Sequence, residues 1–493
     1  MSISSAIKSI QDIMRKDAGV DGDAQRLGQM SWLLFLKVFD AQEEELEFEQ
    51  DDAYSAPIPS QFLWRNWAAD NEGITGEALL EFVNDELFPQ LKNLIAPIDK
   101  NSRGYVVKAA FSDAFNYMKN GTLLRQVINK LNEIDFTDSK ERHLFGDLYE
   151  QILKDLQSAG NAGEFYTPRA ITKFIVAVTD PKLGESIMDP ACGTGGFLAC
   201  AFDHVKANYV KSGDDHQILQ KQIHGVEKKQ LPHLLCTTNM MLHGIEVPVQ
   251  IKHGNTLNKP LSSWDDQVDV IITNPPFGGT EEDGIEKNFP SDMQTRETAD
   301  LFLQLIIEVL NTNGRAAVVL PDGTLFGEGV KTKIKKMLTE ECNLHTIVRL
   351  PNGVFNPYTG IKTNILFFTK GQPTQDVWFY EHPYPDGVKN YNKSKPMKFE
   401  EFETELSWWG DEADGFTSRV ENEQAWKVSI DDIIARNFNL DIKNPHVGEV
   451  INHDPEELLA EYNQQQADIQ ALRDQLKGIL SAALSSSTDG ESK

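Results

Sequence analysis

The fold of this chain depends on one stretch, Val268-Asp269-Val270-Ile271-Ile272-Thr273-Asn274-Pro275-Pro276-Phe277. Its apolar first half predicts a buried β-strand, and its two prolines predict a stiff loop whose carbonyls stay free to accept hydrogen bonds. The Asn274 amide oxygen and the Pro275 carbonyl could therefore hold one amino group, with the Phe277 ring beside a planar substrate. An isolated Asn-Pro-Pro is more often an ordinary turn after a strand, so the interpretation needs further motifs.

A second motif lies upstream, in Ile187-Met188-Asp189-Pro190-Ala191-Cys192-Gly193-Thr194-Gly195-Gly196-Phe197. A short strand runs into a glycine-rich turn and then into a predicted helix, which is the arrangement that lets backbone amides approach a ligand. The spacing is not that of the dinucleotide-binding G-x-G-x-x-G motif. Asp189 would repel a pyrophosphate, whereas it suits a ligand that carries an ammonium or a sulfonium group.

Two further strands are predicted to end in polar side chains. Ile223–Glu227 ends in a carboxylate about 30 residues after the glycine turn, near the place where Rossmann-like sheets hold a ribose. Ile251–His253 is followed by Asn255, whose amide could bond an adenine edge. Taken singly, Glu227 beside two lysines could equally be a surface residue. Successive strand ends with such residues indicate a ligand site at the carboxyl edge of an open α/β sheet.

Together these motifs resemble the S-adenosylmethionine-dependent amino-methyltransferases. The order, glycine turn before Asn274-Pro275-Pro276-Phe277, is that of the γ class of DNA adenine-N6 methyltransferases. The segment Gly163-Glu164-Phe165-Tyr166-Thr167-Pro168-Arg169 is similar to one in modification subunits of type I restriction-modification systems. The resemblance covers nearly the whole chain and extends to Leu27–Phe39, Leu320–Phe326, Leu350–Phe355 and Asn364–Phe368.

The resemblance implies a set of site residues and S-adenosylmethionine as cofactor, with no metal required. Glu227 is assigned to the ribose hydroxyls and Asn255 to the adenine, although many relatives carry Asp at the position of Asn255. The target amino group is assigned to Asn274, Pro275, Pro276 and Phe277. The methionine end of the cofactor is assigned to Glu164, Phe165, Tyr166, Thr167, Pro168, Arg169, Asp189, Gly193, Thr194, Gly195 and Gly196.

The expected fold is α/β, with a Rossmann-like methyltransferase sheet, an α-helical N-terminal domain and a C-terminal helix of coiled-coil type. The expected strands are Ile187–Asp189, Ile223–Glu227, Ile251–His253, Val268–Thr273, Ala316–Leu320, His345–Leu350 and Ile365–Thr369. The expected parts are a helical domain at 1–156, a catalytic domain at 157–370, a mixed segment at 371–452, a partner-binding helix at 453–485 and a disordered tail at 486–493. The irregular stretch Gly278–Thr298 is expected to order over DNA or the target base.

The charge of the chain bears on its partners. A formal net charge of −28 disfavours unaided DNA binding, because phosphates repel an acidic surface. The acidic run Glu43–Asp52 is expected to be solvated, and Lys331, Lys333, Lys335 and Lys336 form one local basic group. A separate specificity subunit would then supply the grip on DNA and the sequence reading. The resemblance implies two modification subunits per specificity subunit, and a restriction subunit is a further candidate partner.

The C-terminal segment offers a joint for that partner. Residues Leu458, Tyr462, Gln465, Ile469, Leu472, Leu476, Ile479 and Ala483 recur at alternating spacings of four and three, which is typical of a coiled-coil seam. A helix packed on its own domain is the alternative. The four cysteines show no C-x-x-C pair and no segment resembles an export or membrane signal, so a cytoplasmic protein with reduced thiols is expected.

The resulting hypothesis is a site-specific DNA adenine-N6 methyltransferase subunit that acts on a base flipped out of the duplex. Two alternatives remain open. One is an amino-methyltransferase that acts on protein or RNA, which Phe277 and the Gly163–Arg169 segment disfavour. The other is a catalytically silent scaffold that keeps the fold to bind a partner. Intact Asp189, Glu227 and Asn274 argue against a silent scaffold.

Overall fold

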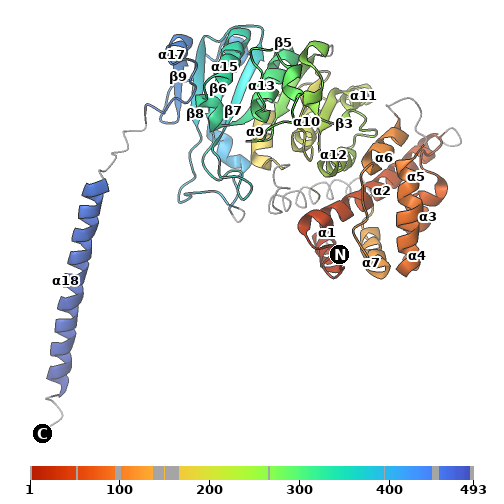
Figure 1. Cartoon of the computed structure of the whole chain (residues 1–493), viewed down its shortest axis with the longest axis horizontal. Helices are drawn as coiled ribbons and strands as arrows, with labels where there is room; N and C mark the ends of the chain where they lie inside the picture. Colours follow the sequence, from red (N-terminus) through yellow and green to blue (C-terminus); the bar gives the residue numbers. More distant parts are fainter. Residues whose placement is uncertain are drawn as a thin grey trace. The chain divides into compact units, whose positions relative to one another are not determined.

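The structure, a computed structural model, divides into two units, Met1–Asn444 and Pro445–Lys493. Its elements can be followed in Figure 1. The residues that it describes are 3–50, 54–94, 102–136, 149, 166–264, 267–392, 395–446 and 455–488.

The N-terminal part is helical, as the apolar spacing predicts. Its central helix is α2, in which Trp32-Leu33-Leu34-Phe35-Leu36 is buried on all sides. A later helix, α12 (Gln230–His243), also contributes here, because it adds Leu234, Leu235 and Met241 to the same core. The helices are α1 (Ile3–Met14), α2 (Asp23–Gln50), α3 (Trp64–Trp67), α4 (Gly76–Glu81), α5 (Phe88–Lys92), α6 (Arg103–Phe111) and α7 (Gly121–Asn132), with a π-helical turn at Phe82–Leu87.

The acidic run of α2 was expected to be solvated, and for Glu43 this is wrong. Its side chain is buried, accepts a hydrogen bond from the Tyr54 hydroxyl and pairs with the Arg103 guanidinium at 2.6 Å. Burial raises the pKa of Glu43, which the nearby positive charge of Arg103 opposes. Glu47 is bonded through both oxygens to Arg65, at 2.7 and 2.8 Å. These ion pairs therefore neutralise part of the negative charge of the helical domain.

The catalytic part is one nine-stranded sheet in the order β3-β2-β1-β4-β5-β7-β6-β8-β9. Strands β1 to β5 pair in parallel, whereas β7 runs antiparallel between β5 and β6. The strands are β1 (Ile187–Asp189), β2 (Ile223–Glu227), β3 (Ile251–His253), β4 (Val268–Thr273), β5 (Leu310–Pro321), β6 (Cys342–Arg349), β7 (Thr363–Lys370), β8 (Asp376–Glu381) and β9 (Ala425–Ser429).

The seven predicted strands are all present, and β1 to β4 have the predicted bounds. The sequence did not predict β8, which pairs with β6, or β9, which pairs with β8. The sheet therefore continues beyond residue 370, where a domain boundary was expected. The C-terminal helix α18 (Pro455–Thr488) also extends past its expected end at residue 485.

Helices cover both faces of the sheet, and side chains alternate between two cores. In β4, Val270 and Ile272 join one core, while Ile271 joins the other. This is the period-two alternation of a strand that is buried on both faces. The covering helices include α9 (Arg169–Thr179), α10 (Gly196–Asn208), α11 (Gly213–Gln222), α13 (Thr298–Val309), α14 (Asp322–Phe326), α15 (Val330–Glu341), α16 (Glu403–Trp408) and α17 (Ile430–Ala435).

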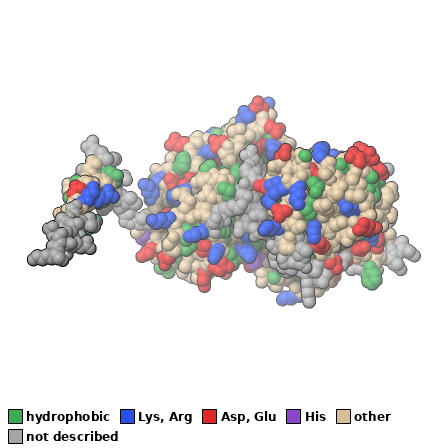
Figure 2. All heavy atoms as spheres, turned by 90° about the horizontal axis from the view of Figure 1, so that it is seen from below, with side chains coloured by type: hydrophobic (Ala, Val, Ile, Leu, Met, Phe, Trp, Pro, Cys, Tyr) green, Lys and Arg blue, Asp and Glu red, His purple; other side chains and the backbone are tan. Residues whose placement is uncertain are grey.

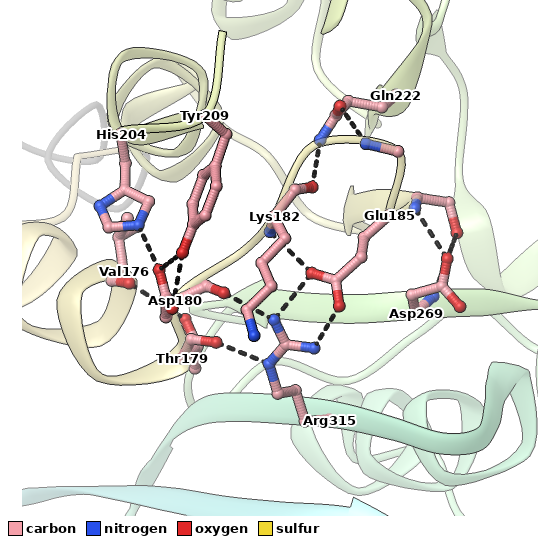
Figure 3. Close-up of polar contacts among 12 residues, drawn as sticks. Val176, Thr179, Asp180, Lys182, Glu185, His204, Tyr209, Gln222, Asp269 and Arg315 are labelled. Atoms are coloured by element: carbon pink, nitrogen blue, oxygen red, sulfur yellow. Dashed lines mark hydrogen bonds and ion pairs between the residues drawn. The ribbon is translucent and has the colours of Figure 1, made fainter. Parts of the chain in front are cut away.

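A hydrogen-bond network closes the end of the sheet opposite the glycine turn (Figure 3). The Arg315 guanidinium, at the start of the paired part of β5, donates to the Thr179 carbonyl at 2.6 Å and the Asp180 carbonyl at 2.8 Å. It also pairs with both oxygens of Glu185, at 2.9 and 2.8 Å. Asp180 ends α9 in the left-handed region, with φ of 41°. Arg315 thus fixes the connection between α9 and β1, which leads to the site.

We expect Arg315→Lys to lower the melting temperature by several degrees. An ammonium cannot reproduce the planar, four-acceptor arrangement, and the loss of charge-assisted bonds to partly buried groups costs about 2 kcal/mol. Calorimetry of the full chain measures the shift. Arg15→Lys is the matched control, because Arg15 makes one exposed pair with Asp12 and should change little. Equal melting temperatures for the two variants would contradict the role of Arg315.

Candidate functional site

The polar strand ends meet at a cavity of about 310 Å³, a size typical of small-molecule sites. It lies at the carboxyl ends of β1, β2 and β4, as the parallel pairing requires. The predicted residues among its lining are Thr167, Asp189, Gly193, Gly196, Glu227, Asn255, Asn274 and Pro276.

Asp189 is the buried acid of the cavity. It ends β1, is 1 % exposed, and accepts hydrogen bonds from the Thr273 hydroxyl at 2.6 Å and the Ala191 amide at 3.1 Å. Burial raises the pKa of Asp189 to about 7, and the two hydrogen bonds oppose this rise only in part. A positive charge in the cavity would favour its ionised form. The residue therefore suits a cationic ligand.

Two glycines of the turn have different surroundings, one at the cavity and one against a helix. Gly193 lines the cavity with φ of 53°, and its amide donates to Glu227 at 3.0 Å. Gly195 has φ of 81° and does not line the cavity, because it packs against α12. A Cβ there would lie 2.7 Å from the Cys236 sulfur. Thr194 is also absent from the lining, and its carbonyl accepts from Asn239 at 3.1 Å.

Of the described residues just before α9, Thr167 reaches the cavity. Thr167 lines the cavity, whereas Tyr166 is buried in the core of the helical domain. Pro168 precedes α9, and the Arg169 guanidinium donates to the Gly196 carbonyl, which ties α9 to the glycine turn. Glu164 and Phe165 were also predicted as site residues and lie outside the described residues.

Asn274 has a divided hydrogen-bonding state. Its amide nitrogen donates to the Thr167 hydroxyl at 3.0 Å, while its amide oxygen is buried and accepts no bond from any residue that the structure describes. A buried acceptor without a donor is costly, so this atom is poised for a ligand. Pro275 is buried, and the half-buried Phe277 ring meets Phe355 edge-on at 5.7 Å.

Several lining residues were not predicted as site residues from the sequence, and the buried acid among them is Glu281. Glu281, in the expected loop after Phe277, is 7 % exposed and lines the cavity. Its carboxylate accepts from Asn255 at 2.9 Å and from Lys228 at 3.1 Å. In the sequence it is one acid among several in an irregular stretch, and no local pattern separates it from its exposed neighbour Glu282. Only the turn of the loop places it inward.

The comparisons with known proteins cover the whole of this architecture. Residues 140–454 match the model of the N-6 DNA methylase family, and residues 3–131 match the HsdM N-terminal domain. The chain is 83 % identical over 484 residues to the type I restriction enzyme EcoEI methylase subunit of Escherichia coli, covering 98 % of this chain and 99 % of that one.

Solved structures agree. A modification subunit of a putative type I restriction enzyme from Vibrio vulnificus is 45 % identical with a TM-score of 0.80, over 91 % of this chain and 98 % of that one. A chain from a type I restriction-modification system is 35 % identical with a TM-score of 0.82, over 98 % and 99 % of the two chains. The chain therefore belongs to the N-6 DNA methylase family of S-adenosylmethionine-dependent adenine-N6 methyltransferases, as a methylase subunit of the type I restriction enzymes.

Proposed function

We propose that this subunit transfers the methyl group to the N6 amino group of an adenine flipped out of DNA, with Asn274 as the catalytic residue. The observation that carries the proposal is the buried Asn274 oxygen at the edge of the cavity, which accepts no hydrogen bond from any described residue. The Thr167 hydroxyl supports the proposal because it accepts a hydrogen bond from the Asn274 amide nitrogen. This bond fixes the amide with its oxygen pointing away from Thr167. A silent scaffold would gain nothing from keeping this buried acceptor unsatisfied.

The chemistry explains why an acceptor is needed. The lone pair of an adenine amino nitrogen is conjugated with the ring, so the nitrogen is a weak nucleophile. The Asn274 oxygen and the Pro275 carbonyl accept its two hydrogens and localise the lone pair on nitrogen. Phe277 offers its ring to the flipped base. Bound S-adenosylmethionine supplies an electrophilic methyl group on a sulfonium.

The cofactor residues divide by the chemistry of their groups. Asp189 receives the positively charged methionine end, Gly193 allows close approach, and Glu227 accepts from the ribose hydroxyls. The two Glu227 oxygens already accept from the amides of Gly193 and Lys229, at 3.0 and 2.6 Å. These bonds orient the carboxylate before a ligand arrives. Among the described residues, no group of three or more His, Cys, Asp or Glu side chains is arranged to hold a metal ion.

We propose that a specificity subunit supplies the contacts that hold DNA, with two methylase subunits per specificity subunit. The lysines of α15 support this division, because Lys331 pairs with Asp300 at 2.7 Å and Lys335 is buried. On the face drawn in Figure 2, basic and acidic side chains are interspersed.

No described helix is long and apolar enough to span a bilayer. The four cysteines are free, and we propose a cytoplasmic protein in which these thiols are reduced.

Helix α18 is the proposed joint with the specificity subunit. In the part of the seam whose side chains are described, Tyr462 is 57 %, Leu472 64 % and Leu476 61 % exposed. The seam residues Leu458, Ile479 and Ala483 lie outside the described side chains. An amphipathic helix of this length with an exposed apolar stripe is the kind of element that pairs with another helix.

The first prediction is that Asn274→Ala lowers the rate of adenine methylation about 10²- to 10³-fold, because a hydrogen bond to the reacting nitrogen is lost. S-adenosylmethionine binding, measured by calorimetry, should stay close to normal. Asn274→Asp is the matched control, since it keeps an acceptor and should retain more activity than the alanine variant. A near-normal rate for Asn274→Ala, assayed with the specificity subunit present, would show that the mechanism is wrong.

The second prediction concerns pH. Because the pKa of Asp189 is about 7 in the free protein and the ligand favours the carboxylate, S-adenosylmethionine affinity should be highest just above pH 7, where the ligand's amino group still carries its proton. It should fall about tenfold per pH unit below 7, with uptake of the ligand releasing a proton. Calorimetry in buffers of different ionisation enthalpy counts that proton. Asp189→Asn should bind more weakly and release less; an unchanged proton count would contradict the assignment.

The third prediction is that truncation after residue 452 leaves a folded chain that binds S-adenosylmethionine but no longer assembles stably with the specificity subunit. The exposed apolar stripe supplies the buried area of the joint. Gel filtration of the mixed proteins measures assembly. Asp474→Lys, a charge change on the face of α18 opposite the stripe, is the control and should co-elute normally. Co-elution of the truncated chain at full affinity would show that the joint lies elsewhere.

A further inference from the structure

Glu281 is held inside the cofactor cavity by the backbone of its loop. Thr280 and Glu297 form an antiparallel bridge, and the Glu281 amide donates to the Arg296 carbonyl at 2.9 Å. The Arg296 guanidinium in turn donates twice to the Glu281 carbonyl, at 3.1 and 2.9 Å. The side chain is therefore aimed by a closed loop base and is not free to swing into solvent.

The neighbours of Glu281 place it at the adenine end of the cavity. Its carboxylate contacts Lys228, which follows the ribose residue Glu227, and Asn255, which follows β3. In an open α/β sheet, the residues after these two strands flank the nucleoside. Asp189, by contrast, ends β1 beside the glycine turn at the methionine end. The carboxylate thus faces the part of the cavity where the base would lie.

The protein itself holds the Asn255 amide at both ends. Its side-chain oxygen accepts from the Leu257 amide at 3.0 Å and caps the short helix Thr256–Asn258. Its side-chain nitrogen donates a hydrogen bond to the Glu281 carboxylate at 2.9 Å. Each end of the amide therefore has one protein partner, and these two bonds fix its orientation beside Glu281.

We propose that Glu281 selects the adenine base of the cofactor, accepting a hydrogen bond from its exocyclic amino group, a role that rests on the cofactor site proposed above. A carboxylate offers about four acceptor positions. One oxygen of Glu281 accepts from Asn255 and Lys228, and the other accepts only a long 3.3 Å bond from Thr298 among the described residues. That second oxygen has room for a ligand donor.

The arrangement gives Asn255 a positioning function. Its amide nitrogen and the Lys228 ammonium hold one oxygen of the carboxylate and thereby orient the other. Hypoxanthine carries a carbonyl where adenine carries an amino group. A hypoxanthine base would lose the hydrogen bond and set its oxygen against the carboxylate. Glu281 thus discriminates by both attraction and repulsion.

The test compares S-adenosyl-L-homocysteine with S-inosyl-L-homocysteine, whose bases differ in the group at C6 and in the proton on the neighbouring N1, by calorimetry on the full chain. The wild-type chain should bind the adenosyl compound about 10- to 100-fold more tightly, as expected for a hydrogen bond to a charged group. In Glu281→Ala this ratio should fall to within about threefold of one. Glu281→Gln keeps the size and one acceptor, so its ratio should be intermediate.

The ratio separates a binding role from a structural one, because damage to the loop would weaken both compounds alike. Asn255→Ser keeps a helix cap but removes the amide donor that orients Glu281, so its ratio should lie between those of the wild-type chain and Glu281→Ala. A wild-type ratio in Glu281→Ala, or in Glu281→Gln if the alanine variant does not fold, overturns the inference and leaves the cofactor site intact. Failure of the wild-type chain to bind S-adenosyl-L-homocysteine would instead remove the cofactor site itself.

Discussion

Parallel pairing of β1 with β2 on one side and β4 on the other is the constraint on which the site depends. Ile187 lies in register with Ile223 and with Val270, so the three strands end at the same edge of the sheet. Asp189, Glu227 and Asn274 are far apart in the sequence and become neighbours only through this pairing. The hydrogen bond from Thr273 to Asp189 joins the two strand ends directly across that edge.

The same edge concentrates polar groups that are costly to bury. Asp189 loses water and has a raised pKa, and the Asn274 oxygen has no donor among the described residues. Such groups lower the stability of the free protein, and a ligand that satisfies them recovers that free energy as affinity or rate. Glu281 follows the other strategy, since three side chains already satisfy most of its acceptor positions. The cavity therefore combines preorganised acceptors with acceptors held open.

The acidic character of the chain is resolved differently in different parts. In the helical domain, the buried Glu43 pairs with Arg103, and the partly exposed Glu47 pairs with Arg65. On α15, Lys331 forms ion pairs with Glu297 and Asp300. Local pairing of both signs leaves little free positive charge for DNA phosphates in the described part of these elements. An exposed stripe on α18 offers instead a surface for a partner.

The sequence by itself determined the elements whose signals are local. Strand bounds for β1 to β4 and the motif order follow from apolar periodicity, prolines and glycines, which act within a few residues. Tertiary structure alone decided the roles that depend on distant neighbours. Gly195 faces Cys236 and not the cavity, Glu43 is buried, and Glu281 turns inward, because each is set by a packing partner remote in the sequence. Strands β8 and β9 likewise exist because an edge of the sheet was available for pairing, and no local pattern encodes that edge.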